Sequence, residues 1–364
     1  MTVLTGKKDT NSWYCQDQMD ECLDFLAWKK FSDDGYVTAY GEDTPSLPDT
    51  FNSFSKPPTD HFIRPLLVEG EQTKEYDSGS YCTGKISSGQ QILDYAIDFV
   101  NTYKNDAFFG FFWLNSFSHD THDHPEAADV LIENFFNRLS YTGVMKNTFV
   151  IFFSDHGLRF GEMRLKMEGY YDERLPTFFI WPATHFKHIE PMKYQSLAYN
   201  QFRLATPYDL YSTLLDIKRA SLCDNTRDIV PEGCPKCHSM FKPISDKRTC
   251  QDAGITEKWC SCHKIVKEYK TAKCWKCANL TLRRILRIHC YEDDRLPAGI
   301  FYVVAFETGP RRMVYEAIVH RRVGSDKLSI VGPISILTTY GSMGSCTMNK
   351  NERMFCACQK AKKC

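Results

Sequence analysis

The sequence lacks an excess of charge of either sign. Among its 364 residues, 45 are basic and 45 are acidic, so the formal net charge is zero. This balance argues against nucleic acid or an anionic membrane surface as the main partner. No uninterrupted apolar run approaches about 18 residues, so no membrane span is predicted. The 43% of hydrophobic residues supply enough core to exclude disorder over most of the chain.

Cysteine is scarce in the first 222 residues, which hold only Cys15, Cys22 and Cys82. The other thirteen cysteines lie between Cys223 and Cys364. Dense clustering and an even total are typical of a disulfide framework formed in an oxidising compartment.

The N-terminal residues also lack a feature that export requires. Residues 1–8 contain no basic segment followed by an apolar stretch, so they form no signal peptide. Asn279 begins an Asn-Leu-Thr sequon and is a candidate glycosylation site. We therefore expect an extracellular or cell-surface glycoprotein whose native chain begins upstream of Met1, with its signal or anchor outside this sequence.

The first part of the chain alternates strand-like and helix-like segments. Helical spacing of apolar residues predicts helices over 92–103 and 126–139. Three continuous apolar runs are typical of strands buried on both faces, namely 107–114, 149–153 and 176–181. This order predicts an α/β fold with a doubly wound, mostly parallel sheet. The Pro-rich and Ser-rich stretch 45–65 is expected to form a long surface loop.

The C-terminal part has a different pattern. Strand-like runs at 301–306, 313–319 and 328–336 are separated by turn signals, which predicts antiparallel strands. We expect two domains: an α/β domain over 1–222 and a small Cys-rich, disulfide-stapled domain over 223–364.

The sharpest candidate site is Ser154-Asp155-His156-Gly157, directly after a predicted buried strand. Ligands of open α/β sheets bind beyond the carboxyl ends of the strands. Carboxylate and imidazole together are common ligands of catalytic divalent metals. We therefore predict Asp155 and His156 as ligands of a divalent metal ion, with Zn, Ca, Mg and Mn all left open. A surface turn with a capping aspartate is the alternative.

A second cluster follows the strand predicted at 107–114. It contains His119, Asp120, His122, Asp123 and His124. The carboxyl ends of parallel strands meet at one edge of a sheet, so at least one histidine is expected to reach the site. Asp120 and His124 are candidates for a second metal. The alternative is a solvated loop that caps the helix beginning near Pro125.

Basic residues between the second and third predicted strands include Arg164, Lys166 and Arg174. Cations there could hold a phosphate or sulfate oxyanion. A solvated face with Glu–Arg pairs is the alternative for most of them.

Two CxxC motifs begin at Cys234 and Cys274. Their spacing is compatible with structural zinc. Disulfides are favoured, because zinc at these four would leave the other C-terminal cysteines unexplained, and no thioredoxin-like context indicates redox chemistry.

Six segments of the chain match the pattern of a known family: 58–65, 113–120, 147–157, 159–161, 172–176 and 203–211. Over these segments the chain resembles a sulfatase-like family of unknown function from invertebrate extracellular proteins, within the alkaline phosphatase/sulfatase superfamily. The resemblance implies metal-dependent hydrolysis of sulfuric or phosphoric esters, with glycans among the substrates. It also implies that Asp155 and His156 bind the metal, and that His119 faces the metal or substrate, with Lys166 as a further catalytic candidate. The ester would be attacked by a Thr, Ser or formylglycine nucleophile.

Two departures from the family pattern affect this expectation. Leu4-Thr5-Gly6-Lys7 resembles the end of the nucleophile signature, which would place the nucleophile before Met1 and leave this chain inactive alone. Gly35-Tyr-Val-Thr-Ala-Tyr-Gly41 resembles a second signature that continues with sulfate-binding Lys, Trp and His, but Glu42-Asp43-Thr44 follow here. The alternative function is therefore a non-catalytic extracellular binding protein with the same fold.

Overall fold

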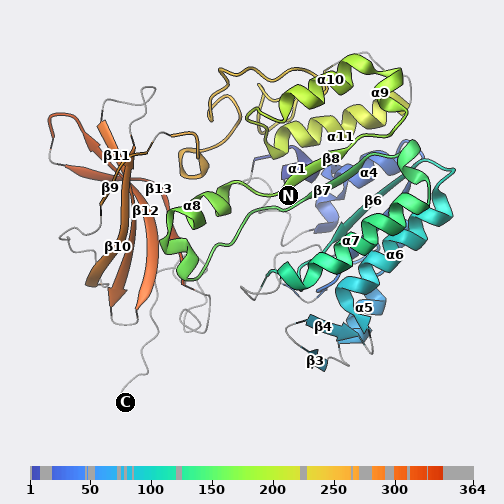
Figure 1. Ribbon diagram of the computed structural model, residues 1–364, viewed down its shortest axis with the longest axis horizontal. Helices are drawn as coiled ribbons and strands as arrows, with labels where there is room; N and C mark the ends of the chain where they lie inside the picture. The colour runs from blue at the N-terminus through green and yellow to red at the C-terminus, as the bar shows by residue number, and fades with distance from the viewer. Residues whose placement is uncertain are drawn as a thin grey trace. The chain divides into compact units, whose positions relative to one another are not determined.

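The structure is a computed structural model in which two compact units are recognised (Figure 1). Unit 1 comprises Met1–Ile151 and Ile180–Gly254, and unit 2 comprises Phe152–Phe179 and Ile255–Cys364. The structure describes residues 2–8, 19–45, 47, 54–71, 75–77, 80–83, 86–119, 125–221, 228–263, 265–269, 281–291, 299–309, 312–325 and 327–338. The units thus group 152–179 with the C-terminal strands, and the domain boundary predicted at residue 222 stays a prediction.

Unit 1 mixes helices with short strands. Its elements are α1 (Thr2–Thr5), η1 (Met19–Phe25), α4 (Ala27–Ser32), β1 (Val37–Glu42), β2 (His61–Phe62), α5 (Arg64–Glu71), β3 (Glu75–Asp77), β4 (Ser80–Thr83), β5 (Ile86–Ser87), α6 (Ser88–Tyr103), β6 (Phe108–Trp113), α7 (Pro125–Tyr141), η2 (Val144–Lys146), α9 (Phe186–Ile189), α10 (Pro191–Asn200) and α11 (Pro207–Ser221). The predicted helices 92–103 and 126–139 are thereby confirmed within α6 and α7.

A parallel sheet of order β2-β1-β6 lies at the centre of unit 1. Tyr40 and Phe111 point to one face, where they pack with Trp28 of α4. Ala39 and Phe112 point to the other face, where they pack with Phe99 of α6 and side chains of α7. Successive side chains of a strand alternate between faces, so helices covering both faces require apolar residues at every position. This explains the continuous apolar run of β6.

The remaining strands of the α/β part form separate small sheets. Strands β3-β4-β5 form an antiparallel sheet, and β7 (Val150–Phe153) pairs with β8 (Phe178–Trp181). The three predicted segments are therefore confirmed as strands, whereas a single doubly wound sheet stays a prediction. Burial on both faces was wrong for β8, where Phe178 is 38% and Phe179 54% exposed, because β8 pairs with β7 in a two-stranded sheet. Within the predicted loop 45–65, β2 forms and α5 begins, because backbone pairing with β1 outweighs the turn-forming composition.

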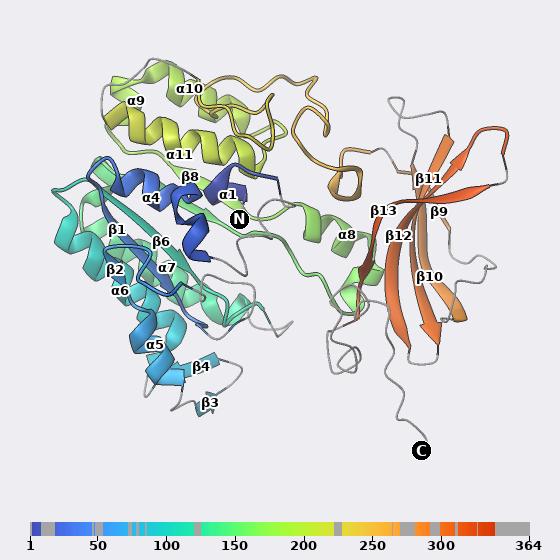
Figure 2. The same cartoon turned by 180° about the vertical axis from the view of Figure 1, so that it is seen from behind.

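Unit 2 is built on a five-stranded antiparallel sheet of order β13-β12-β11-β10-β9 (Figure 2). Its elements are η3 (Glu162–Leu165), α8 (Met167–Arg174), η4 (Glu257–Trp259), β9 (Ile265–Tyr269), β10 (Thr281–Tyr291), β11 (Gly299–Gly309), β12 (Met313–Arg322) and β13 (Leu328–Ile336). The predicted antiparallel strands are confirmed as β11, β12 and β13, while β9 and β10 were not predicted. In the described part of the chain, no helix has the length and apolarity to cross a membrane.

Residues from the 152–179 segment complete the core of unit 2. Tyr170 of α8 packs with Tyr291, Phe301, Val303 and Ile318 of the sheet. All five residues are at most 4% exposed. A helix encoded more than 100 residues before these strands therefore covers part of their apolar face.

His289 on β10 makes the stability of unit 2 dependent on pH. Burial, with Arg287 beside it, lowers the pKa of His289 to about 3, and the residue is 1% exposed. The unfolded chain binds this proton near pH 6.5, so the contribution is complete above 6.5 and falls as pH drops toward 3. We expect unit 2 to lose about 2 kcal/mol of unfolding free energy from this group between pH 7 and pH 5.

Urea unfolding at pH 7 and pH 5 measures this effect, with His289→Gln as the comparison. The variant should lose less stability on acidification than the parent chain. Because the Glu316 carboxyl has a pKa lowered by neighbouring arginines, its own contribution is lost only at lower pH. Equal pH dependence in the two proteins would contradict the prediction.

Candidate functional site

The carboxyl ends of β1 and β6 bring together four buried polar residues in unit 1. Glu42 ends β1 and Asp43 follows it, while Asn115 and Ser116 come after β6. Each of the four is at most 6% exposed. The parallel register pairs Glu42 with Trp113, so the two chain ends lie side by side. This is the sheet edge at which α/β proteins bind ligands.

Asp43 is an acceptor for the turn after β6. Its Oδ1 accepts from the Asn115 amide N at 2.6 Å, and its Oδ2 accepts from the Ser116 amide N at 3.2 Å and the Ser116 hydroxyl at 2.5 Å. Burial raises the pKa of Asp43, while hydrogen bonds from Ser116, Asn115 and Thr44 lower it; the pKa remains above its usual value. Asp43 therefore organises the turn that leads to His119.

Glu42 is held in the same way by neutral donors. Its carboxylate accepts from the Tyr40 hydroxyl at 2.6 Å and from the Asn115 side-chain amide at 2.8 Å. Two adjacent carboxylates thus lie where the resemblance would place cations that bind sulfate. Such a pair repels an anion, although it suits a cation or a neutral group.

Asp155 and His156 form a pair directly after β7, in unit 2. The Nε2 of His156 lies 3.2 Å from Oδ2 of Asp155, and its Nδ1 lies 2.7 Å from the carbonyl oxygen of Gly157. A carbonyl oxygen only accepts, so Nδ1 carries a proton and donates it. In a neutral ring Nε2 then has a lone pair facing the carboxylate, which is favourable only with a proton or a cation between them.

This donor set fits a divalent cation. Metal-ligating histidines usually donate their second ring N–H to a carbonyl or carboxylate, as His156 does to Gly157. The Asp155 side chain is 55% exposed and the His156 side chain 35%, so an ion can reach both. With a metal bound, the pair would supply one carboxylate and one imidazole ligand.

The other predicted site residues lie in different places. His119 is exposed in unit 1, and its amide donates to the Asn115 carbonyl at 2.9 Å. The Lys166 side chain is exposed in unit 2, immediately before α8. Asp120, His124 and Asn279 lie outside the described residues. The approach of His119 to Asp155 and His156 stays a prediction, since the residues belong to different units.

The first CxxC motif is a disulfide. Cys234 and Cys237 are bonded to each other, with Cα atoms 5.3 Å apart. Cys22, Cys250 and Cys260 are also disulfide-bonded. The second motif, Cys274 to Cys277, lies outside the described residues.

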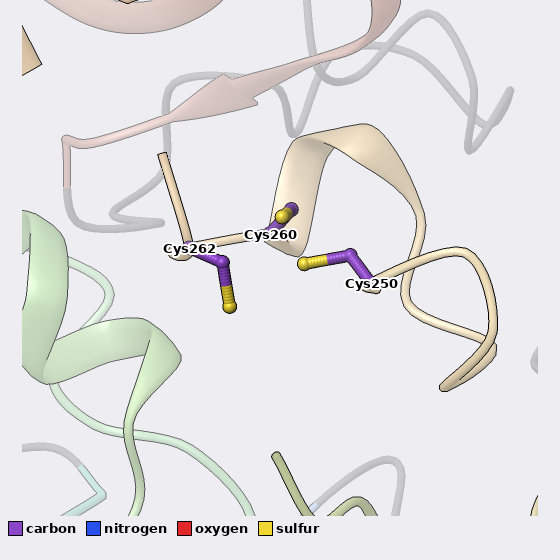
Figure 3. A group of neighbouring side chains, drawn as sticks. All are labelled: Cys250, Cys260 and Cys262. Carbon is purple, nitrogen blue, oxygen red and sulfur yellow. The ribbon is translucent and has the colours of Figure 1, made fainter. Parts of the chain in front are cut away.

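Three cysteine sulfur atoms form a further group that could hold a metal ion. Those of Cys250, Cys260 and Cys262 lie within 4.8 Å of one another (Figure 3). Metals bind cysteine as the thiolate. Because Cys250 and Cys260 are in disulfides, the group would need reduction before it could bind an ion. None of these three cysteines is among the predicted metal ligands.

The sequence predicts Asp155 and His156 as metal ligands from their place after a strand, but it gave Glu42 and Asp43 no role as buried hydrogen-bond acceptors. An available signal was the polar pair Asn115-Ser116 after β6, opposite two acids that end β1. Only the register shows that these four residues meet.

The chain was also compared with known proteins. The model of a family described as a protein of unknown function (DUF229) matches residues 1–290, which is most of the chain. No curated protein matches the sequence.

Proposed function

Because this chain belongs to the DUF229 family, whose function is unknown, we propose a function from its own residues. In this proposal the protein is sulfatase-like and metal-dependent. It belongs to the class that hydrolyses sulfuric or phosphoric esters, and Asp155 and His156 are its metal ligands. The observation that carries the proposal is the His156 ring, which donates through Nδ1 to Gly157 and turns Nε2 toward the Asp155 carboxylate.

The residues have distinct roles in this proposal. A bound divalent ion would polarise the ester oxygens, which is the chemistry it supplies. Gly157 fixes the ring orientation of His156 through its carbonyl. His119 is the candidate contact to substrate, and Lys166 is the candidate cation for the oxyanion. The Cys234–Cys237 disulfide supports folding in an oxidising, extracellular compartment.

One observation favours a second function, a non-catalytic extracellular binding protein. The buried carboxylates of Glu42 and Asp43 occupy the signature that otherwise binds sulfate. Their charge opposes an anionic substrate at the β1 edge. In this alternative the metal site remains, but ester turnover does not occur.

Metal binding by the whole chain tests the proposal. We expect Asp155→Asn with His156→Gln to weaken binding of at least one of Zn²⁺, Mn²⁺, Mg²⁺ or Ca²⁺ by at least about tenfold, because a charged carboxylate and an imidazole are replaced by neutral amides. Bound metal is measured after dialysis under non-reducing conditions, which keep Cys250 and Cys260 oxidised. His188→Gln, an exposed histidine on α9, is the matched control and should bind metal like the parent chain.

Turnover then separates the two functions. The metal-loaded chain is assayed with an aryl sulfate, a phosphate monoester and a phosphodiester. Metal-dependent hydrolysis that is lost in the double variant supports the hydrolase. Turnover by this chain would rule out the binding protein, and unchanged metal affinity in the double variant would contradict the assignment of the ligands.

A further inference from the structure

A buried charge network in unit 2 connects the Asp155–His156 segment with the C-terminal sheet. Three arginines and two glutamates form it, and their side chains are at most 3% exposed: Arg164, Glu173, Arg174, Arg287 and Glu316. Arg164, Glu173 and Arg174 belong to the segment 152–179, whereas Arg287 lies on β10 and Glu316 on β12.

Glu316 is the acceptor that all three arginines share. Its Oε1 accepts from Arg174 at 2.9 Å and lies 3.5 Å from Arg164, and its Oε2 accepts from Arg287. The neighbouring arginines lower the pKa of this buried carboxyl, although burial alone would raise it. The carboxylate therefore remains charged at neutral pH and holds the arginines together.

Arg287 adds a second connection, to the backbone of the segment. Its guanidinium donates to the carbonyl of Arg164 at 2.9 Å and to that of Lys166 at 2.8 Å. Glu316 orients this guanidinium through the other nitrogen. Residues of two strands of the C-terminal sheet, β10 and β12, thus hold the backbone at the start of α8 in place.

The end of α8 then holds the turn that carries the metal ligands. Glu173 accepts from Arg164 and Arg174 through its side chain, and its carbonyl accepts from the Gly157 amide at 3.3 Å. A Cβ on Gly157 would lie 2.0 Å from the carbonyl oxygen of Asp172, so the turn packs directly against this backbone. Ser154 is joined to Thr177 by two further hydrogen bonds.

We propose that Glu316 is a positioning residue for the Asp155–His156 metal site, acting through Arg164, Arg174 and the backbone of Glu173. The C-terminal sheet is in this sense a part of the site, although it contributes no ligand. This inference rests on the proposed metal-binding function. It adds that Glu316, more than 150 residues away in the sequence, supports the turn that carries Asp155 and His156.

The test compares Glu316→Gln with the parent chain by two measurements. Hydrogen exchange without metal reports the turn itself, and we expect the amides of residues 154–157 to exchange at least about tenfold faster while β11 amides stay protected. Binding of the metal found for the parent chain should weaken by about tenfold. Glu307→Gln is the matched control, because this buried acid on β11 pairs with Arg283 and Arg284 and not with the segment.

The outcomes separate this inference from the proposed function. Unchanged exchange at 154–157 and unchanged metal affinity in folded Glu316→Gln would overturn the positioning role. Absence of metal binding by the parent chain would overturn the proposed function, while the exchange measurement still decides whether Glu316 holds the turn. If Glu316→Gln unfolds, Arg174→Lys replaces it, since the lysine keeps the charge but loses the second contact of the guanidinium. The same local acceleration at 154–157 is then expected, and its absence contradicts the role.

Discussion

Replacing Asp209 with alanine is expected to lower the unfolding free energy of unit 1 by about 3–5 kcal/mol. Asp209 is fully buried near the start of α11. Its carboxylate accepts from both terminal nitrogens of Arg248, at 2.8 and 3.0 Å, and from the amides of Thr206 and His238. The substitution leaves a guanidinium that is 6% exposed without its counter-charge.

Urea unfolding followed by circular dichroism measures this loss. Asp228→Ala is the matched control, since Asp228 pairs with Lys242 on an exposed surface and should change stability little. The loss of unfolding free energy for Asp209→Asn should lie between those of the two alanine variants, because the amide oxygen still accepts hydrogen bonds while the negative charge is removed. A loss for Asp209→Ala no larger than that for Asp228→Ala would show that the buried pair is not needed.

Replacing Asp43 with alanine is expected to cost about 2–5 kcal/mol, because each buried donor left unpaired costs about 1–3 kcal/mol. The donors that lose their acceptor are the amides of Asn115 and Ser116 and the hydroxyl of Ser116. We also expect faster hydrogen exchange at residues 115–119, since the His119 amide bonds to the carbonyl of Asn115.

Asp43→Asn is the informative comparison for this position. It keeps an oxygen that accepts from the Asn115 amide. It also removes the buried carboxyl group, whose pKa is raised by burial. We expect its cost to be less than half that of the alanine variant. An equal loss in both variants would mean that the charge, and not the hydrogen bonding, stabilises the turn.

Local patterns predicted many of the elements. Helices α6 and α7 followed from the spacing of apolar residues, and β6 and β11 from continuous or β-branched runs. These signals depend on near neighbours in the chain, which the sequence displays directly. Strand β10 was not predicted from the sequence. It follows a Cys-rich segment, and Arg284 and Arg287 interrupt the run of apolar residues that would indicate a strand.

The pairing of these elements was decided by contacts between distant residues. The order β2-β1-β6 brings Glu42 and Asp43 to Asn115 and Ser116, which are more than 70 positions away. The sequence shows two acids at the end of one strand and two polar residues after another. Their shared burial depends on the parallel register of two strands that are distant in the sequence, and a slip of one residue would turn these side chains to the other face.

By itself, the sequence predicted Asp155 and His156 as metal ligands, which stays a prediction, and it determined that an α/β part precedes antiparallel strands. Only the tertiary structure decided that the segment bearing those ligands packs with the C-terminal sheet, through Arg174, Arg287 and Glu316. The physical reason is that a buried charge is tolerated only beside its partner. That partner is defined by the folded geometry, and nothing near Glu316 in the chain identifies it.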